Sequence, residues 1–340
     1  LRLGTHLPAP NEESMALTFT DLPLNELRTY SPELAVPEGL DAFWTETLDH
    51  ARAAASAPVI TPAHTPISEI VIEDMEFSGF AGDPIRAWIS RPRSNEPRPA
   101  VIEYLGYGGG RGLPGEHLKW AACGYIHVLM DTRGQGGNWG SGGDTPDPHG
   151  SGPAAQGVMT RGIHDPSQYY YRRMFTDAVR LVETVAEFDG VDRDRIAVTG
   201  GSQGGGTAIA AAALSPLVAA AMPDVPFLCD FPRSITRTPS APFTEITRYL
   251  SVNRDAAAAA LHTLSHFDGA ILARRITAPA LFSVALMDEI VLPASVFAAY
   301  NAVSSADKNI EVYEYNGHEG GGHHQWLRQV SWLAERFGAD

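Results

Sequence analysis

The chain has 340 residues, of which 44% are apolar, and a formal net charge of -15 at pH 7. This much apolar sequence can bury the core of one large domain or two ordinary ones, so we expect a globular protein. An acidic chain without a long run of Lys or Arg does not fit a protein that binds the phosphate backbone of nucleic acid, because such binding needs a concentrated basic surface. Neutral or polar small molecules are better candidates for its substrate.

The same sequence predicts neither a membrane anchor nor a secretory leader. No apolar stretch approaches the roughly 20 uncharged residues that a membrane helix needs, and no basic segment followed by an apolar block opens the chain. We therefore expect a cytoplasmic protein. Cys123 and Cys229 lie far apart with no CxxC spacing, which predicts two buried thiols and neither a disulfide framework nor a zinc site.

The N-terminal part of the chain divides into an extension and an arm. Residues 1–14 show no periodic pattern, so we expect a disordered extension or a cloning remnant there. Residues 15–340 are expected to form a single domain. Within this domain, we expect residues 15–69 to form a helical arm or cover, because apolar side chains recur at helical spacing over residues 37–55.

The sheet is expected to begin at residue 70. Residues 70–77 and 85–91 alternate apolar and polar side chains around a turn-forming connection, which predicts an antiparallel hairpin. Continuous apolar runs then alternate with amphipathic helices, the pattern of a mostly parallel sheet covered by helices on both faces. The fold class is therefore α/β. The expected parallel strands are residues 100–105, 125–130, 195–199, 280–285 and 310–315.

Residues 226–277 interrupt this alternation with polar and Pro-containing segments. Residues 248–265 within them have the composition of a helix. We interpret the whole segment as a helical insertion that covers the active-site edge of the sheet.

The strongest chemical signal is the Gly-Gly-Ser-Gln-Gly sequence at residues 200–204, which follows an expected strand and precedes a helix-forming segment. This is the context that a G-x-S-x-G nucleophile elbow requires. The serine backbone is strained at such an elbow, and glycines leave room for the neighbouring chain. The alternative of a phosphate-binding loop fits poorly, because no Lys follows within the loop and the glycine spacing differs from G-x-G-x-x-G. Ser202 is the candidate nucleophile.

A serine hydroxyl needs a histidine to take its proton, and that histidine needs a carboxylate to orient it. In α/β-hydrolases the acid and the histidine follow the serine in that order. Asp288 lies just beyond the expected strand 280–285, and His318 follows the strand 310–315. Both should lie at the carboxyl edge of the sheet, where ligands of open α/β sheets bind. The competing acids are Asp255 and Asp268, which fall in the insertion, and Asp307, which precedes a strand.

Two further clusters have alternative interpretations. The His and Glu residues at 318–324 could suggest a metal site, but three glycines separate them and the spacing does not match H-E-x-x-H. We expect no metal, and we expect His323 and His324 to lie at a helix N-terminus or on the surface. The Gly-rich loop at 106–112 follows the strand 100–105 and can supply a second oxyanion donor, the backbone N–H of Tyr107. The first donor is the N–H of Gln203. A mobile surface loop is the alternative for 106–112.

Three motifs together resemble carbohydrate esterase family seven, the acetyl xylan esterases and cephalosporin C deacetylases. They are Arg-Gly-Gln at 133–135, the elbow at 200–204 and His-Glu at 318–319. The likeness extends to residues 140–146, 226–231 and 287–288, so it covers roughly residues 20–340. One departure is visible, because the family usually has His and Asn around the Gly-Tyr of the first loop, where this chain has Leu105 and Gly108.

The resemblance implies an α/β-hydrolase fold, deacetylation of xylo-oligosaccharides and of cephalosporin C, no cofactor, and a homohexamer made of three dimers. It implies that Ser202, Asp288 and His318 form the catalytic triad. Carried over in the same way, the backbone N–H groups of Tyr107 and Gln203 form the oxyanion hole, and the side chains of Tyr107, Phe227 and Ile290 line a small acyl pocket.

Other roles remain open at this stage. Arg133 and Gln135 are expected to be scaffold residues that bond backbone carbonyls near the nucleophile loop. Another α/β-hydrolase, such as a peptidase or an esterase for longer acyl groups, is the first alternative function. A carbohydrate-binding relative that has lost catalysis is the second.

Overall fold

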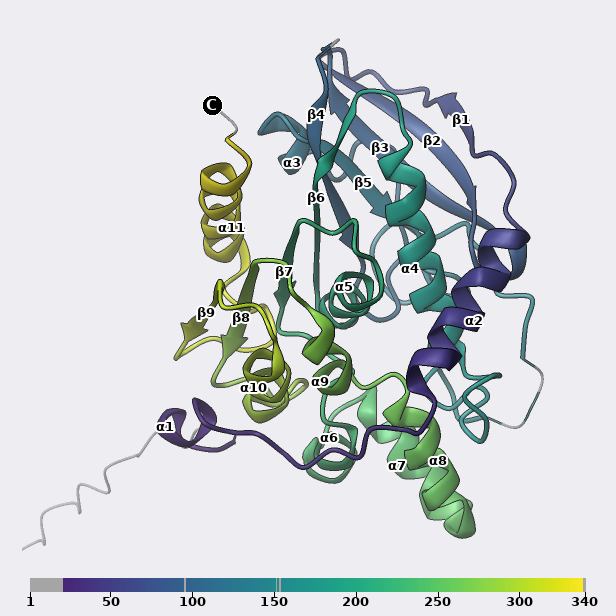
Figure 1. Cartoon of the computed structure of the whole chain (residues 1–340), viewed down its shortest axis with the longest axis vertical. Coiled ribbons are helices and arrows are strands. Elements are labelled where there is room, and N and C mark those ends of the chain that lie inside the picture. Colours follow the sequence, from purple (N-terminus) through teal and green to yellow (C-terminus); the bar gives the residue numbers. More distant parts are fainter. Residues whose placement is uncertain (1–20, 95, 151, 153, 339–340) are drawn as a thin grey trace, which may run out of the picture.

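The computed structural model describes residues 21–94, 96–150, 152 and 154–338. The extension expected at residues 1–14 lies outside the described residues. Within these described residues, nine strands form a single sheet in the order β1-β2-β3-β5-β4-β6-β7-β8-β9 (Figure 1). The strands are β1 (Val59–Pro62), β2 (Ile70–Ser78), β3 (Pro84–Pro92), β4 (Arg98–Tyr104), β5 (Ile126–Met130), β6 (Val191–Gly201), β7 (Ala220–Asp224), β8 (Ala280–Ala285) and β9 (Lys308–Tyr313).

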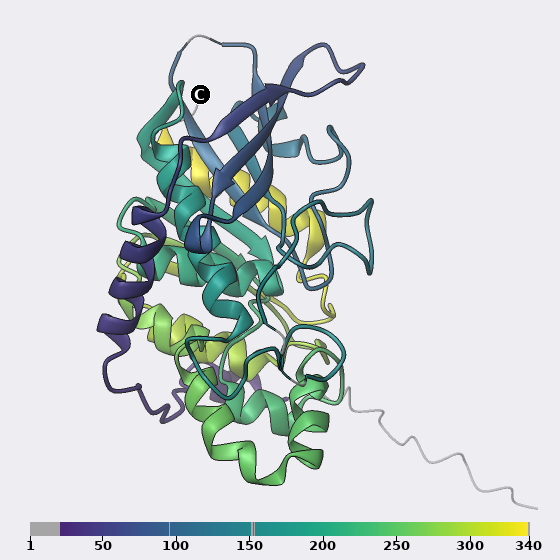
Figure 2. The ribbon, with the colours of Figure 1, turned by 90° about the vertical axis from the view of Figure 1, so that its right-hand side faces the viewer.

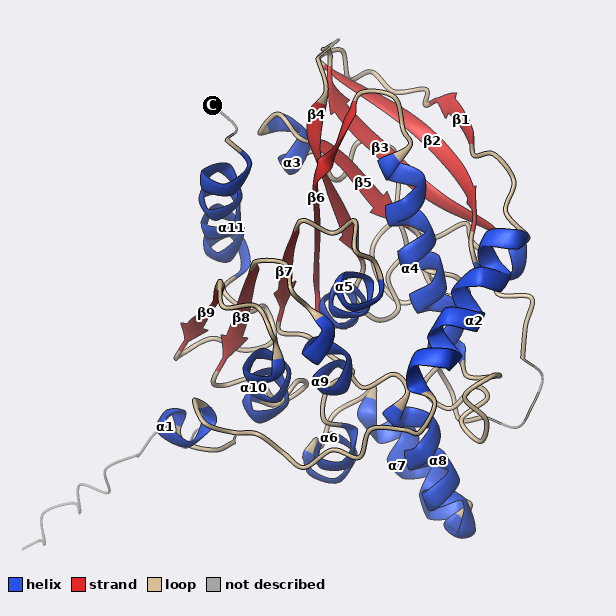
Figure 3. Ribbon diagram, viewed as in Figure 1, coloured by secondary structure: helices blue, strands red, loops and turns tan. Residues whose placement is uncertain are grey.

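Helices cover both faces of this sheet (Figure 3). The predicted α/β class is confirmed, and so is the predicted hairpin, which is formed by β2 and β3. The α-helices are α1 (Leu24–Leu27), α2 (Leu40–Ala53), α3 (Lys119–Ala122), α4 (Tyr170–Ala186), α5 (Gln203–Leu214), α6 (Phe231–Arg237), α7 (Phe243–Val252), α8 (Ala257–Ser265), α9 (Gly269–Leu272), α10 (Pro293–Ala302) and α11 (Gly322–Phe337). Short 3-10 turns occur at Phe80–Gly82, Arg254–Ala256 and Ala273–Arg275.

The sheet has an antiparallel part and a parallel part. From β1 to β3, and between β3 and β5, neighbouring strands pair antiparallel. From β5 through β4 to β9 every pairing is parallel. Parallel strands have their carboxyl ends at one edge, so the loops that follow β4, β6, β8 and β9 meet there. This edge holds all the predicted catalytic side chains.

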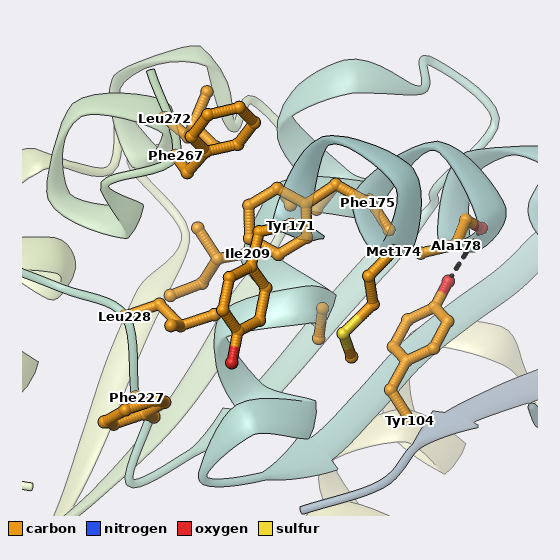
Figure 4. Close-up of a cluster of buried hydrophobic side chains, with 14 of the residues drawn as sticks. Tyr104, Tyr171, Met174, Phe175, Ala178, Ile209, Phe227, Leu228, Phe267 and Leu272 are labelled. Atoms are coloured by element: carbon orange, nitrogen blue, oxygen red, sulfur yellow. Dashed lines mark hydrogen bonds between the residues drawn. The ribbon is translucent and has the colours of Figure 1, made fainter. Parts of the chain in front are cut away.

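The larger core lies between the sheet and the helices α4 and α5. Figure 4 shows Met174 and Phe175 of α4 packed near Ile209 of α5, and all three side chains are fully buried. The hydroxyl of Tyr104 donates to the carbonyl of Ala178 at 3.1 Å, which satisfies a polar group inside this core. Each large apolar side chain buried in this way contributes about 1.5–3 kcal/mol to folding, so this packing fixes the strand that carries the nucleophile.

A second, smaller core lies on the opposite face, under α3 and α11. It contains the buried aromatic side chains Trp120, Tyr125 and Phe337 together with Leu333. The C-terminal helix α11 therefore packs its apolar side chains on this face of the sheet. Together the two cores explain why the parallel strands are apolar on both faces.

Some elements differ from the sequence-based expectation. The sheet begins earlier than residue 70, because β1 pairs with β2 and so belongs to the sheet and not to a helical arm. The strand β7 and the helix α10 were both missed. β7 is short and rich in Ala, a residue depleted in strands. α10 is apolar on nearly every side and buried at seven of its ten residues, so it shows no amphipathic period.

The helix expected over 248–265 is two helices. α7 starts earlier and ends at Val252, and α8 follows after a 3-10 turn. Asn253 breaks the helix with backbone angles φ -99° and ψ 66°, and its side-chain amide donates to the carbonyl of Tyr249 at 3.0 Å. Asn often ends helices through such local hydrogen bonds. The prediction of one continuous helix was therefore wrong.

The two cysteines also differ from each other. Cys229 is buried as expected, but Cys123 is exposed. It caps the short helix α3 just before Gly124, where the chain turns at the surface. The prediction of two buried thiols was correct only for Cys229.

The insertion at 226–277 contributes α6 to α9. In Figure 2 the green helices of residues 231–265 gather at one end of the molecule. The arrowheads of β7 and β8 in Figure 1 point toward the end where α6, α7 and α8 lie. The insertion thus lies beside the carboxyl edge of the sheet. Within the described ranges, no helix has both the length and the apolar character that crossing a bilayer requires.

Candidate active site

Ser202 occupies a strained turn between β6 and α5. Its backbone angles are φ 56° and ψ -118°, a region that residues with a side chain rarely adopt. The surrounding backbone holds this conformation: the Ser202 N–H donates to the carbonyl of Asp224 at 3.0 Å, and its carbonyl accepts from the N–H of Phe227 at 2.9 Å. The side chain is only partly buried. The predicted elbow is therefore present, and it presents the hydroxyl at the surface of a cavity.

The glycines of the elbow are required by the passing strand. A Cβ atom on Gly204 would lie 2.1 Å from the carbonyl oxygen of Tyr104, and one on Gly200 would lie 2.5 Å from the same atom. Both contacts are far shorter than any real Cβ contact, and the neighbour is backbone that cannot move aside. These positions therefore accept no side chain while β4 and β6 stay paired.

Asp288 and His318 come together as predicted from their strand ends. The Nδ1 atom of His318 lies 2.8 Å from Oδ2 of Asp288, which is fully buried. The other carboxylate oxygen, Oδ1, accepts the backbone N–H groups of Ile290 at 2.8 Å and Val291 at 2.9 Å. These two bonds fix the carboxylate, so the imidazole is oriented with Nε2 as its free nitrogen.

The competing acids have other partners. Asp268 accepts backbone N–H groups at the start of α6 and α9 and so caps these helices. Asp307 pairs with Arg336, and Asp255 is exposed in a 3-10 turn. None of the three is bonded to His318 among the described residues. The structure therefore supports Asp288 as the acid.

The neighbouring histidines lie at the start of the C-terminal helix α11. His323 and His324 are exposed in the first turn of α11, as expected, and the ring of His323 stacks on Trp326 at 4.9 Å between centroids. In the part of the chain that the structure describes, no group of three or more His, Cys, Asp or Glu side chains could hold a metal ion.

An open cavity of about 840 Å³ brings the predicted site residues together. Ser202 and His318 both line it, as do Tyr107 and Ile290. The cavity is bounded by loops from the sheet edge and by the insertion. Its outer lining comprises Asn138, Trp139, Gln156, Gly157, Ala241, Pro242, Glu245 and Arg248.

Phe227 is the predicted pocket residue that does not line this cavity. It is fully buried, and Figure 4 shows it in the hydrophobic cluster. Its ring packs on Phe243 of α7 at 4.3 Å and against Tyr107 at 6.5 Å between centroids. Because Phe243 of α7 covers its ring, Phe227 contacts the ring of Tyr107 and does not reach the cavity. The expectation that Phe227 contacts the acyl group directly is corrected to a supporting role.

Two backbone N–H groups are the candidate oxyanion donors. Gln203 is the first residue of α5, so its N–H has no carbonyl one turn earlier to bond. The N–H of Tyr107, in the loop after β4, has no hydrogen-bond acceptor among the described residues. The positive end of the α5 dipole also points to this place. That both N–H groups bind one oxyanion stays a prediction.

Known proteins share this sequence and fold. The family model described as acetyl xylan esterase (AXE1) matches residues 15–336. The chain belongs to the acetyl xylan esterase family. This confirms the resemblance inferred from the motifs, and the α/β-hydrolase fold that it implied.

Two solved structures show how close the likeness is. The acetyl xylan esterase from Paenibacillus sp. R4 is 35% identical, with a TM-score of 0.85 over 92% of this chain and 99% of that one. Acetyl xylan esterase 1 from Thermoanaerobacterium sp. JW/SL YS485 is 33% identical, with a TM-score of 0.84 over the same shares. A curated relative, the acetyl esterase Axe7A of Xylanibacter ruminicola, is 23% identical over 307 residues. That alignment covers 83% of this chain and 64% of the relative.

Within this acetyl xylan esterase fold, Gln135 is a scaffold residue as predicted, but its bonds go to a backbone N–H and to side chains and not to the backbone carbonyls expected. Its Oε1 accepts the N–H of Gly108 at 2.6 Å, and its Nε2 donates to Oε1 of Gln203 at 2.9 Å and to the hydroxyl of Tyr170 at 2.9 Å. One amide thereby connects the two loops that carry the oxyanion donors. Gly108 also departs from the family pattern, and a Cβ there would lie 2.6 Å from the side chain of Asn138, which fills the space.

Arg133 has a different role from the one expected. It is fully buried and pairs with carboxylates instead of backbone carbonyls, at 2.6 Å to Asp177, 2.9 Å to Asp83 and 3.3 Å to Asp147. Its neighbouring charges raise the pKa of the guanidinium further, although burial opposes them. A buried cation is tolerated when carboxylates compensate it. Arg133 therefore joins the loop after β5 to α4 and does not touch the nucleophile turn.

Asp224, at the carboxyl end of β7, is an acid next to the nucleophile that the sequence analysis missed. It lines the cavity, and its side chain accepts from the amides of Gln325 at 2.9 Å and Gln329 at 2.8 Å. Burial raises the pKa of this carboxyl group to about 7, although these amides lower it. The strand that holds it was not expected from the sequence, so no signal placed Asp224 here.

The raised pKa of Asp224 predicts a pH dependence of stability. Because its pKa in the folded state lies above the ordinary value of 3.8, its contribution is fully present below about pH 4 and is lost as the pH rises through about 7. Asp224→Asn stays neutral throughout. The difference in free energy of unfolding between wild type and Asp224→Asn is therefore expected to shift against the wild type between pH 4 and 7. Urea unfolding at several pH values measures it, and a constant difference would contradict the prediction.

Proposed function

We propose that this chain removes acetyl groups from acetylated xylo-oligosaccharides and similar small esters, cephalosporin C included, through an acetyl-enzyme on Ser202. The single observation that carries the proposal is the Asp288–His318 hydrogen bond of 2.8 Å beside a cavity that Ser202 and His318 share. Membership of the acetyl xylan esterase family supports acetyl ester hydrolysis in particular.

The reaction follows from the roles of these groups. His318 takes the proton of the Ser202 hydroxyl, and the oxygen forms a bond to the acetyl carbonyl carbon. The N–H groups of Tyr107 and Gln203 hold the negative oxygen, and each is worth about 3 kcal/mol in the transition state. The C–O bond of the ester breaks, and His318 gives its proton to the leaving alcohol. Water then attacks the acetyl-enzyme in the same way and releases acetate.

The size of the acyl group tests this proposal against a longer-acyl esterase. Tyr107, Ile290 and Pro242 line the same cavity as Ser202, and we propose that these side chains restrict the acyl group to a small one. Hydrolysis of p-nitrophenyl esters is expected to be fastest for acetate and to fall steeply with chain length. Activity that stays constant beyond about six carbons would instead favour the longer-acyl alternative.

The remaining alternatives need different experiments. A peptidase would cleave peptide amides with an efficiency comparable to acetyl esters, so a peptide panel separates the two. A relative that binds carbohydrate without catalysis would not react at Ser202 with an organophosphate, because an unactivated serine is inert. A panel of acetylated xylose, acetylated oligomers and cephalosporin C then ranks the natural substrates.

We also propose a cytoplasmic homohexamer made of three dimers. The hexamer rests on the family resemblance, and light scattering tests it. The location is supported by the two free cysteines, Cys123 and Cys229, since a reducing compartment keeps thiols unpaired. Cell fractionation of the native organism tests the location.

A further inference from the structure

Tyr107 is held by contacts that its role as an oxyanion donor does not by itself require. Its hydroxyl donates to Oε1 of Glu245, on α7 of the insertion, at 2.7 Å. The same hydroxyl accepts the backbone N–H of Val158 at 2.7 Å. The hydroxyl oxygen therefore has both a donor and an acceptor partner, so the ring has one preferred position.

Glu245 also holds the loop that Val158 belongs to. Its second oxygen, Oε2, accepts the backbone N–H of Met159 at 3.2 Å. The loop passes so close that a Cβ on Gly157 would lie 2.2 Å from a carboxylate oxygen of Glu245. One carboxylate thus joins three segments that are distant in sequence: the loop after β4, residues 157–159 and α7.

The other end of Tyr107 is fixed as well. Its backbone carbonyl accepts the indole N–H of Trp139 at 2.7 Å. The indole ring of Trp139 also packs on the glycines of the loop after β4, and a Cβ on Gly109 would lie 2.3 Å from this ring. Tyr107 is thus held both at its carbonyl and at its hydroxyl, which limits how far its backbone can turn.

We propose that Glu245 is a positioning residue for the oxyanion hole, acting through the hydroxyl of Tyr107 to hold the Tyr107 N–H toward the developing oxyanion. The inference rests on the proposed function, because it needs the Tyr107 N–H to be a donor in ester hydrolysis. It gives the insertion a task in catalysis besides covering the cavity.

The electrostatics of the pair agree with this role. Burial raises the pKa of the Tyr107 hydroxyl above its ordinary value, so it remains a donor at neutral pH. Burial also raises the pKa of Glu245, while the bonds from Tyr107 and Met159 and the nearby Arg161 and Arg248 lower it. The hydrogen bond to a carboxylate is stronger than one between neutral groups.

The effect should appear in turnover more than in substrate binding. An oxyanion donor acts on charge that forms only in the transition state, so its displacement lowers kcat and leaves KM nearly unchanged. Complete loss of one donor costs about 10²–10³-fold in kcat. A donor that is present but less well held should cost less, and we expect a decrease of about 10- to 100-fold for Glu245→Ala.

The experiment compares five variants with the wild type in p-nitrophenyl acetate hydrolysis and thermal unfolding. Glu245→Ala and Tyr107→Phe should each lower kcat. The double variant should have a kcat no lower than that of the less active single variant, because both substitutions remove the same hydrogen bond. Glu245→Gln should recover part of the activity, since its amide oxygen can still accept from the tyrosine. Tyr30→Phe is the matched control, because Tyr30 makes a similar 2.8 Å bond to Asp230 away from the cavity lining. It should keep wild-type kcat.

Three results would overturn the inference: wild-type kcat in Glu245→Ala, additive losses in the double variant, or equal losses in the Gln and Ala variants together with a lower melting temperature. The last of these would indicate a structural role alone. Failure of the proposed function is a distinct outcome, because the wild-type protein itself would then not hydrolyse acetyl esters.

Discussion

Replacing Ser202 with alanine is expected to lower kcat for p-nitrophenyl acetate by about a millionfold, to near the background rate. The physical reason is that the variant lacks the hydroxyl that forms the acyl bond while His318 accepts its proton. Water bound in place of the hydroxyl would be poorly oriented for attack. Steady-state kinetics with highly purified protein measures the loss, since traces of wild-type enzyme would mask it.

The fold should survive this substitution. Ser202 is held by its backbone bonds to Asp224 and Phe227, and alanine keeps both. Circular dichroism and the unfolding midpoint are therefore expected to match the wild type within experimental error. Ser68→Ala, in the exposed loop between β1 and β2, is the control and should keep full activity. Undiminished hydrolysis by Ser202→Ala would refute the assignment of the nucleophile.

The local parts of this site are readable from the sequence because short-range physics determines them. The elbow needs Gly200 and Gly204 where β4 passes within van der Waals distance, and no other residue type fits. Asp288 and His318 were found by their positions after apolar strands, since parallel strands bring their carboxyl ends to one edge. The order Ser, acid, His along the chain then assigned each of them its role.

The parts that were missed or misassigned depend on contacts between distant segments. Phe227 is apolar and next to the site in sequence, yet Phe243 of α7 covers it, and nothing local shows how the insertion packs. The bond between Tyr107 and Glu245 joins residues 138 positions apart. Asp224 belongs to an Ala-rich strand that carries a weak pattern of its own. Such contacts appear only when the whole sheet is assembled.

The family comparison and the geometry answer different questions. The match over residues 15–336 establishes the family and supports the acetyl ester as substrate. It does not say which side chain is mobile, charged or bonded in this chain. The hydrogen bonds around Asp288 do, and they make one further substitution informative.

Asp288→Asn is expected to lower kcat by about 10⁴-fold while the fold is retained. The reason lies in the two oxygens of the carboxylate. Oδ1 accepts the N–H groups of Ile290 and Val291, so an asparagine must place its carbonyl oxygen there and its NH₂ toward His318. An NH₂ group there can only donate, so the Nδ1 atom of His318 must lose its proton and Nε2 must carry one. That tautomer cannot accept the proton of Ser202.

Denaturant unfolding and organophosphate labelling at high pH distinguish this mechanism from simple loss of structure. A protein with the wrong tautomer should unfold at nearly the wild-type denaturant concentration, and it should still react slowly with an organophosphate at high pH. Asp307→Asn is the matched control, because its carboxylate pairs with Arg336 and lies away from His318. It should keep wild-type kcat. If Asp288→Asn also kept it, the carboxylate would have no part in orienting the imidazole, and the histidine at 318 would have to be held by its own loop instead.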